Sequence, residues 1–174
     1  KFFSEDYVKA YPSDHQTEAQ VDGVIHLLDL SSPCRILDLA CGYGRHTLAL
    51  WEKGFDVFGL DNSAKLLDRA AQDTVSRGLE NSTPFTQADM RVLPYRDNSF
   101  DYVLSLFTSF GYFDTEEEDQ VVLGEIARAL KPGGKFLLDV LNKEWLMAHF
   151  EERFWKQGEK AKLLNEMDFD YERG

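Results

Sequence analysis

The chain has 174 residues, 43% hydrophobic and 29% charged, which fits a single domain that buries roughly 70% of the surface its unfolded chain exposes. No apolar run is long enough for a membrane span and the first residues lack the apolar stretch of a secretory signal, so we expect a cytoplasmic protein. Lys and Arg number 19 against 31 Asp and Glu, and the formal net charge of −12 disfavours a nucleic-acid partner because it repels a phosphate backbone.

Cys34 and Cys41 are the only cysteines in the chain. Two thiols are too few for a disulfide framework and have no companions at the spacing of a zinc site, so we expect both to be reduced and no metal to be bound. The acidic run at residues 116–119 is typical of the solvated first turn of a helix, where it favours the positive end of the helix dipole. We prefer this interpretation to a cation site.

Hydrophobic periodicity and capping signals divide residues 17–141 into alternating helices and strands. Capping-box patterns begin at Thr17 and Thr115, and Ser63 is a further N-cap candidate. The predicted elements, in chain order, are a helix over residues 17–30, a strand over 35–39, a helix over 45–53 that ends at Gly54, a strand over 55–60, a helix from Ser63 to Gly78, strands over 84–88 and 101–107, a helix opened by Thr115, a turn at 131–134 and a strand over 136–141. Strands separated by helices of this length predict an α/β fold, a doubly wound and mostly parallel sheet with helices on both faces.

The pattern changes beyond residue 141. Residues 145–154 are typical of a short helix, and residues 163–171 alternate loosely as a single strand does. A strand without a successor needs a pairing partner from its own domain or from another chain, because an edge of unpaired N–H and C=O groups invites association.

Residues at the carboxyl ends of the first two predicted strands indicate a nucleotide ligand. Gly42 and Gly44 lie in a turn between a strand and a helix, where the missing side chains let a ligand approach the backbone amides at the helix N-terminus. Asp61 ends the second strand, where its carboxylate can accept hydrogen bonds from both hydroxyls of a ribose. A dinucleotide site prefers a third glycine three residues after Gly44, and this chain has Thr47 there.

Five short motifs follow one another between residues 35 and 141. They are Leu37-Asp38-Leu39-Ala40-Cys41-Gly42-Tyr43-Gly44, Gly59-Leu60-Asp61, Ala88-Asp89-Met90, Phe100-Asp101-Tyr102-Val103-Leu104-Ser105-Leu106 and Leu130-Lys131-Pro132-Gly133-Gly134. In this order they resemble the class I S-adenosylmethionine-dependent methyltransferases, whose sheet is Rossmann-like. The stretch 106–113 is similar to a branch of small bacterial and archaeal methyltransferases that insert a β segment after the fifth strand.

The resemblance implies S-adenosylmethionine as the cofactor and suggests a contact for each of its parts. Asp38 would orient the glycine loop and the amino end of the cofactor, Asp61 would hold the ribose, and Asp89 would accept a hydrogen bond from the adenine amino group. The remaining contacts would come from Ala40, Cys41, Gly42, Tyr43 and Gly44 in the loop, Asn62 and Met90 beside the adenine, and the backbone carbonyl of Leu106. Many members of the family have glycine where this chain has Ala40, and alanine is small enough to be tolerated.

The activity that the resemblance implies is methyl transfer to a small-molecule acceptor. A sulfonium already activates its methyl group, so an in-line displacement needs mainly alignment of the reacting groups and exclusion of water, and a general base is optional. Two alternatives stay open, because doubly wound sheets carry many functions. One is an NAD-dependent oxidoreductase and the other is a catalytically inactive nucleotide-binding module.

Several residues that could carry chemistry are interpreted structurally. His46, one turn into the helix after the glycine loop, is expected to be a hydrogen-bonding partner rather than a base. Cys41 is expected to be a small buried thiol. Tyr7 and Tyr11 lie in the N-terminal segment, residues 1–16, which we expect to fold over the cofactor as a lid. An aromatic series follows the fourth strand where a substrate would meet the methyl group, and we expect part of it to be core: Phe107, Phe110, Tyr112 and Phe113.

The family's sheet continues with two strands after the fifth, and no motif in this chain corresponds to them. Residues 142–174 resemble the start of the inserted segment on the substrate side. We therefore expect a single methyltransferase domain that holds the cofactor half of the site and lacks part of the substrate half. The fifth strand would then expose an edge that favours a homo-oligomer.

Overall fold

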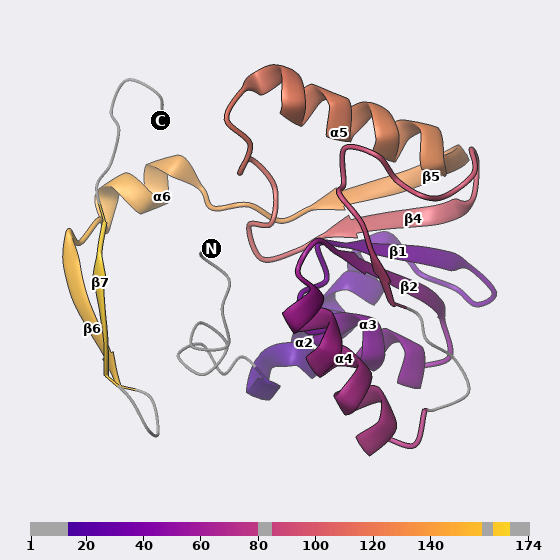
Figure 1. Ribbon diagram of the computed structural model, residues 1–174, viewed down its shortest axis with the longest axis horizontal. Coiled ribbons are helices and arrows are strands. Elements are labelled where there is room, and N and C mark those ends of the chain that lie inside the picture. Colours follow the sequence, from indigo (N-terminus) through magenta and orange to yellow (C-terminus); the bar gives the residue numbers. More distant parts are fainter. Residues whose placement is uncertain (1–13, 80–84, 158–161, 168–174) are drawn as a thin grey trace. The chain divides into compact units, whose positions relative to one another are not determined.

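The computed structural model describes residues 14–79, 85–157 and 162–167 (Figure 1). Residues 14–140 belong to one compact unit and the residues from Leu141 onward to a second, and each unit is described by itself. The elements, labelled as in Figure 1, are α2 (Asp14–Leu28), β1 (Arg35–Leu39), α3 (Arg45–Glu52), β2 (Asp56–Asp61), α4 (Ala64–Ser76), β3 (Phe85–Gln87), β4 (Phe100–Ser105), α5 (Glu116–Ala129), β5 (Leu130–Leu138), α6 (Lys143–Ala148), β6 (Arg153–Gln157) and β7 (Lys162–Glu166). Among the helices in these residues, none combines the length and the apolar content needed to cross a membrane.

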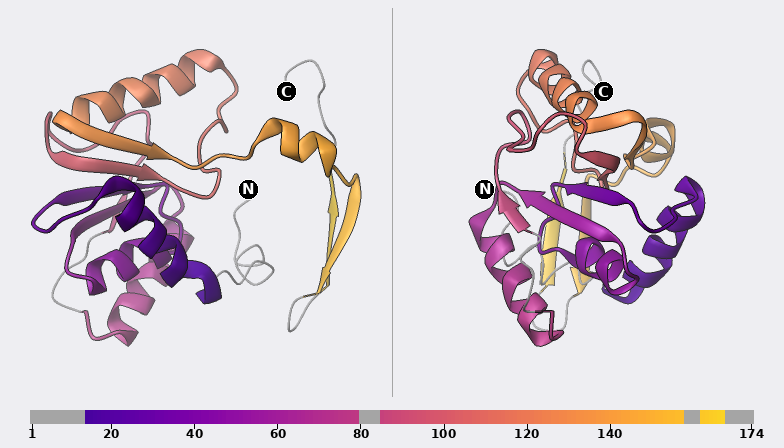
Figure 2. Two further views of the ribbon diagram at one scale, coloured as in Figure 1. Left: turned by 180° about the vertical axis from the view of Figure 1, so that it is seen from behind. Right: turned by 90° about the vertical axis from the view of Figure 1, so that its right-hand side faces the viewer.

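The larger unit is built on a five-stranded sheet with the strand order β3-β2-β1-β4-β5. Every neighbouring pair of strands in it runs parallel. Figures 1 and 2 show α5 on one side of this sheet and α2, α3 and α4 on the other. The structure therefore confirms the predicted doubly wound α/β fold, in which the chain reverses its winding direction between β1 and β4.

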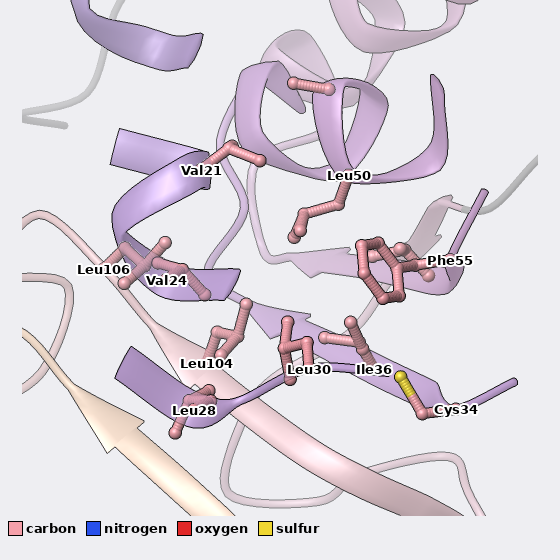
Figure 3. Close-up of a cluster of buried hydrophobic side chains, with 12 residues drawn as sticks. Val21, Val24, Leu28, Leu30, Cys34, Ile36, Leu50, Phe55, Leu104 and Leu106 are labelled. Atoms are coloured by element: carbon pink, nitrogen blue, oxygen red, sulfur yellow. The ribbon is translucent and has the colours of Figure 1, made fainter. Parts of the chain in front are cut away.

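Two hydrophobic clusters cover the two faces of the sheet, because successive residues of a strand point to opposite sides. Ile36 of β1 belongs to the cluster that α2 and α3 cover, and the next residue, Leu37, belongs to the cluster that α5 covers. Figure 3 shows Val24 of α2 and Leu50 of α3 in the first cluster together with Ile36. Strand β1 is thus buried on both faces, which explains its nearly continuous apolar sequence.

The predicted helix signals at three positions are confirmed. The Ser63 hydroxyl accepts a hydrogen bond from a backbone N–H in the first turn of α4, and the Thr115 hydroxyl does the same for α5. Gly54, just after α3, has φ +89°, a left-handed conformation that glycine adopts without steric cost. These signals depend on side chains within three or four residues of each helix end, so the sequence reveals them directly.

The predicted capping box at Thr17 is wrong. Helix α2 already includes Asp14, so Thr17 lies inside the helix and its hydroxyl is not available as an N-cap. Its side chain is buried and accepts a hydrogen bond from Arg45 Nη1 at 3.0 Å. The Thr17 hydroxyl therefore takes part in a tertiary contact with Arg45 and does not cap the helix.

The turn predicted at residues 131–134 is part of a strand instead. Strand β5 begins at Leu130 directly after α5, and its pairing register with β4 shifts near this point. Gly133 has φ +81°, and a Cβ on Gly134 would stand 2.9 Å from the carbonyl oxygen of Lys131 and 3.0 Å from that of Asp101. The two glycines thus accommodate an irregularity within the strand rather than a separate turn. The strand also ends earlier than expected, at Leu138.

The smaller unit contains one strand, β6, that the sequence analysis did not predict. Helix α6 is short, and residues that were expected to continue it form β6 instead. Strands β6 and β7 pair antiparallel, with Trp155 opposite Leu164, so the strand expected near the end of the chain finds its partner in the preceding segment. In the sheet of the larger unit, β5 pairs with β4 on one side only among the described residues.

Candidate functional site

The loop from Ala40 to Gly44 connects β1 to α3 at the carboxyl edge of the sheet, where open α/β folds bind their ligands. The Cys41 N–H donates to the carbonyl oxygen of Leu60 at 2.9 Å, and the Gly44 N–H donates to that of Cys41 at 3.0 Å. The first bond holds the loop against β2, and the second closes a turn within the loop. Gly42 has φ +60°, and no atom of the described residues lies within 4 Å of the position that a Cβ would take, so these residues leave room for a ligand beside its backbone.

The carboxylate of Asp61 joins this loop to the start of α4. One oxygen accepts the Gly42 N–H and the other accepts the Ser63 N–H, each at 2.8 Å. The side chain is buried, and a carboxylate has further lone pairs beyond the two that these bonds use. Asp61 therefore shapes the glycine loop and can still accept hydrogen bonds from a ligand.

Asp38 is a buried carboxyl beneath the same loop. Its Oδ2 accepts a hydrogen bond from the Thr47 hydroxyl at 2.6 Å. Burial raises the pKa of Asp38 to about 6, although the Thr47 hydrogen bond and the charge of Arg45 both lower it. Thr47 stands where a dinucleotide site prefers glycine, and its hydroxyl gives the departure from that pattern a physical reason.

The sequence analysis missed the part that Phe85 plays beside the loop. A Cβ on Gly44 would stand 2.4 Å from the Phe85 ring, and a Cβ on Gly59 would stand 2.6 Å from it. Phe85 and Gly59 are direct neighbours in the register of β2 and β3. Gly44 and Gly59 are therefore glycines because an aromatic ring fills the space beside them, and only the pairing of β2 with β3 reveals this.

The residues predicted to surround an adenine lie just after β2 and β3. Asn62 is exposed, and its carbonyl oxygen accepts a hydrogen bond from the Gln87 side chain at 3.2 Å. Asp89 follows β3 by two residues and pairs with Arg91 at 2.6 Å. Met90 packs against the hydrophobic cluster under α5. Asn62 and Asp89 thus lie at the same edge of the sheet, after β2 and β3, and their contact with an adenine stays a prediction.

The segment after β4 has an unusual backbone. Phe107 and Thr108 have φ of 59° and 56°, values that residues with side chains rarely adopt. Asp139 holds both residues, because its Oδ2 accepts the Phe107 N–H at 3.1 Å and its carbonyl oxygen accepts the Thr108 N–H at 3.0 Å. The carbonyl oxygen of Leu106, predicted to bind an amino group, accepts a hydrogen bond from the Ser109 hydroxyl at 2.8 Å, and a carbonyl oxygen has two lone pairs, so it can accept a second bond.

A buried arginine connects α2 to the loop and to the segment after β4. Arg45 donates to the side chains of Thr17 and Gln20, and its guanidinium lies 4.3 Å from the centre of the Phe107 ring. His46 Nε2 lies 3.0 Å from the Gln20 side-chain oxygen. Burial lowers the pKa of His46 to about 3, so its imidazole is neutral at physiological pH, which agrees with the structural interpretation of this residue.

Other predicted residues also have structural surroundings. Cys41 is buried, and burial raises the pKa of its thiol well above the ordinary value, so it is not a reactive thiolate. Tyr43 is half-buried beneath the guanidinium of Arg69. In the aromatic series, Phe110 and Phe113 pack against the cluster under α5, whereas Phe107 and Tyr112 are exposed. Tyr7 and Tyr11 lie outside the described residues.

Comparison with known proteins identifies the family. Residues 36–134 match the family model described as a methyltransferase domain. This match covers more than half of the chain and contains the glycine loop, Asp61 and Asp89. The chain belongs to the methyltransferase-domain family.

Individual relatives agree with this assignment. The chain is 33% identical to the glycine/sarcosine N-methyltransferase of Halorhodospira halochloris, in an alignment that covers 84% of this chain and 62% of the relative. It shares its fold with the PH0226 protein of Pyrococcus horikoshii OT3, with a TM-score of 0.71, 24% identity, and coverage of 92% of this chain and 82% of that one. A SAM-dependent methyltransferase from Methanosarcina mazei is 29% identical, with a TM-score of 0.59 and coverage of 66% and 55%. The chain spans between 42% and 62% of the length of the first curated relatives it matches.

Proposed function

We propose that this chain binds S-adenosylmethionine and contributes the cofactor site of an enzyme that methylates a small molecule. One observation carries the proposal. The Asp61 carboxylate, at the end of β2, accepts the Gly42 N–H and so holds the glycine loop beside a buried anionic acceptor. A ribose at Asp61 would place the attached amino-acid part over the loop and the attached base along the ends of β2 and β3. Family membership favours this reading over an NAD-dependent oxidoreductase.

The residues present fit such a cofactor. The described residues leave open space beside the backbone of Gly42, and Asp38 is a buried carboxyl whose raised pKa a nearby cation would lower. Asp61 and Asp89 are acceptors of the kind that ribose hydroxyls and an adenine amino group require. The three carboxyl groups thus offer acceptors for the hydrogen-bond donors of S-adenosylmethionine, which are its amino group, its ribose hydroxyls and the adenine amino group. They also carry the negative charge that its cationic groups favour.

The chain's own residues would bind and orient rather than react. When bound, S-adenosylmethionine supplies an activated methyl group on its sulfonium, so alignment and exclusion of water account for most of what the protein must do. Leu106 and the constrained Phe107 lie at the end of β4, where they would border the methyl group and shield it from water. His46 is neutral and engaged with Gln20, so we assign it no proton transfer.

We propose a small molecule as the methyl acceptor. Relatives of this chain are named for small substrates, including glycine and sarcosine in one protein and demethylmenaquinone in another. The formal net charge of −12 opposes a polyanionic substrate such as RNA or DNA. Both observations support a small molecule as the class of acceptor.

The proposal is tested by calorimetric titration of the chain with S-adenosylmethionine, with S-adenosylhomocysteine and, in parallel, with NAD. We expect the two sulfur ligands to bind and NAD not to bind. Asp61→Ala should weaken binding of S-adenosylhomocysteine by about 1.5–3 kcal/mol, because a charge-assisted hydrogen-bond acceptor is lost. Asp56→Ala is the matched control, since it removes the same group from the exposed opposite end of β2.

The outcomes separate clearly. Preferential NAD binding by the unaltered chain would contradict the proposed cofactor. Equal affinity of the Asp61→Ala variant and the unaltered chain, with both folded by circular dichroism, would contradict the role of Asp61. An equal loss of affinity in Asp61→Ala and Asp56→Ala would show that the effect is one of general charge rather than of a contact.

A further inference from the structure

Arg91 connects three separate parts of the molecule beside the predicted adenine position. Its Nε donates to both oxygens of Asp89, at 3.1 and 3.2 Å, and its Nη2 donates to Oδ2 at 2.6 Å. Its Nη1 pairs with Glu118 in the first turn of α5. The guanidinium also lies 4.5 Å from the centre of the Phe113 ring, in the aromatic segment that follows β4. The guanidinium that binds Asp89 is therefore itself held in place by Glu118 and by the Phe113 ring.

These contacts set both the orientation and the charge of Asp89. A planar guanidinium that engages both carboxylate oxygens fixes the plane of that carboxylate, which a single ammonium group does not. The backbone N–H of Arg91 also donates a hydrogen bond to Oδ1 of Asp89 at 2.9 Å. The hydrogen bonds from Arg91 lower the pKa of Asp89, so this carboxyl stays ionised and can only accept hydrogen bonds.

Asp89 lies next to the predicted ribose position. The Ala88 N–H donates to the carbonyl oxygen of Asp61 at 3.1 Å, which joins the end of β3 to the end of β2. A nucleoside held by its ribose at Asp61 would thus extend its base toward Asp89. An ionised carboxylate there accepts a hydrogen bond from the 6-amino group of adenine. It repels the oxygen of the 6-oxo group in hypoxanthine, because that oxygen carries no hydrogen.

We propose that Arg91 is a positioning residue that makes Asp89 selective for a 6-amino purine, and that it does so by holding the carboxylate between α5 and the aromatic segment. The inference rests on the proposed function, because it takes the ligand to be an adenosine derivative. In this proposal Arg91 touches no ligand atom and acts only through Asp89. It also predicts that adenine recognition depends on Glu118, which lies outside the sheet edge.

Arg128 provides a matched control within the same architecture. It also connects α5 to the segment between β3 and β4, where it pairs with Asp97 at 2.8 Å and donates to the carbonyl oxygens of Leu93 and Tyr95. It forms a further pair with Glu125 on α5. Arg128 therefore has the same kind of structural role at the other end of the helix, away from Asp89.

The experiment compares two ligands that differ at one position of the purine. Kd is measured by calorimetry for S-adenosylhomocysteine and S-inosylhomocysteine, with the unaltered chain and with Arg91→Gln, Arg91→Lys and Arg128→Gln. We expect the unaltered chain to prefer the adenosyl ligand and Arg91→Gln to reduce this preference by about tenfold or more. Arg91→Lys should retain part of the preference, because lysine keeps the positive charge but lacks the planar group that binds both carboxylate oxygens. Arg128→Gln should lower the urea midpoint and leave the preference unchanged.

A second measurement does not depend on any ligand. The pKa of Asp89, followed by carboxyl carbon NMR, should rise in Arg91→Gln and stay as it is in Arg128→Gln. If the Arg91 variants fold and keep the full preference between the two ligands, the positioning role is overturned. An equal loss of preference in Arg128→Gln would also overturn it, because any bridge to α5 would then suffice. Failure of the unaltered chain to bind S-adenosylhomocysteine would instead contradict the proposed function, and the NMR result would still decide whether Arg91 controls Asp89.

Discussion

Replacement of Asp38 by Asn tests whether the carboxylate beneath the glycine loop is held at a cost to stability. Burial raises its pKa from 3.8 to about 6 in the folded chain. The folded state therefore binds more protons than the unfolded state between these two pH values. The contribution of Asp38 to stability is fully present below pH 3.8 and is lost as the pH rises through about 6.

The magnitude follows from the two pKa values. A pKa raised from 3.8 to about 6 corresponds to about 3 kcal/mol of lost stability once the group is ionised. About 1.4 kcal/mol of this falls between pH 5 and pH 8, by the same linkage relation. This range lies above the isoelectric point of about 4.7, where low net charge promotes precipitation. Asn cannot ionise, and its amide oxygen can still accept the Thr47 hydroxyl.

The assay is urea unfolding, followed by circular dichroism, of the unaltered chain and Asp38→Asn at pH 5, 6, 7 and 8. The free energy of unfolding of the variant relative to the unaltered chain should rise by about 1.4 kcal/mol across this range. Any constant cost of burying the amide N–H groups cancels in this comparison. Thr47→Val removes the hydrogen bond that lowers the pKa of Asp38, so this pKa should rise further. The pH-dependent loss of stability in this variant should therefore extend to higher pH than in the unaltered chain. A difference between Asp38→Asn and the unaltered chain that is constant with pH would refute the reasoning.

Two further substitutions test the backbone of the site. Ala40 has φ +58°, so Ala40→Gly should raise the free energy of unfolding by about 0.5–1 kcal/mol. Ala71→Gly, at an exposed position of α4, should lower it by about 1 kcal/mol. If urea unfolding shows both variants to be less stable than the unaltered chain, the left-handed conformation of Ala40 is contradicted. Gly59→Ala would place a Cβ 2.6 Å from the Phe85 ring and should cost about 1–3 kcal/mol, and a double variant with Phe85→Leu should recover part of this loss in a double-mutant cycle. Strict additivity of these two changes would show that the ring is not the obstacle.

Much of the candidate site could be predicted because it depends on chain direction. Parallel strands bring their carboxyl ends to one edge of a sheet, so motifs at the ends of β1, β2 and β3 meet there whatever the details of packing. Asp61 and Gly42 were predicted as separate ligand contacts, and the structure shows a hydrogen bond between them. Arg91 was not predicted, because its contacts with Glu118 and Phe113 join residues that are distant in the sequence.

The sequence by itself determined the elements whose signals are local. Strand β1 has the predicted bounds, and Ser63 and Thr115 cap their helices, because each signal depends on residues within one turn or one strand. Only the tertiary structure decided what the remaining polar and small residues do. Thr17 accepts a hydrogen bond from Arg45 instead of capping a helix, and Gly59 makes room for a ring from β3. A hydroxyl or a missing side chain suits many local roles, and the partner that the fold brings to it selects one.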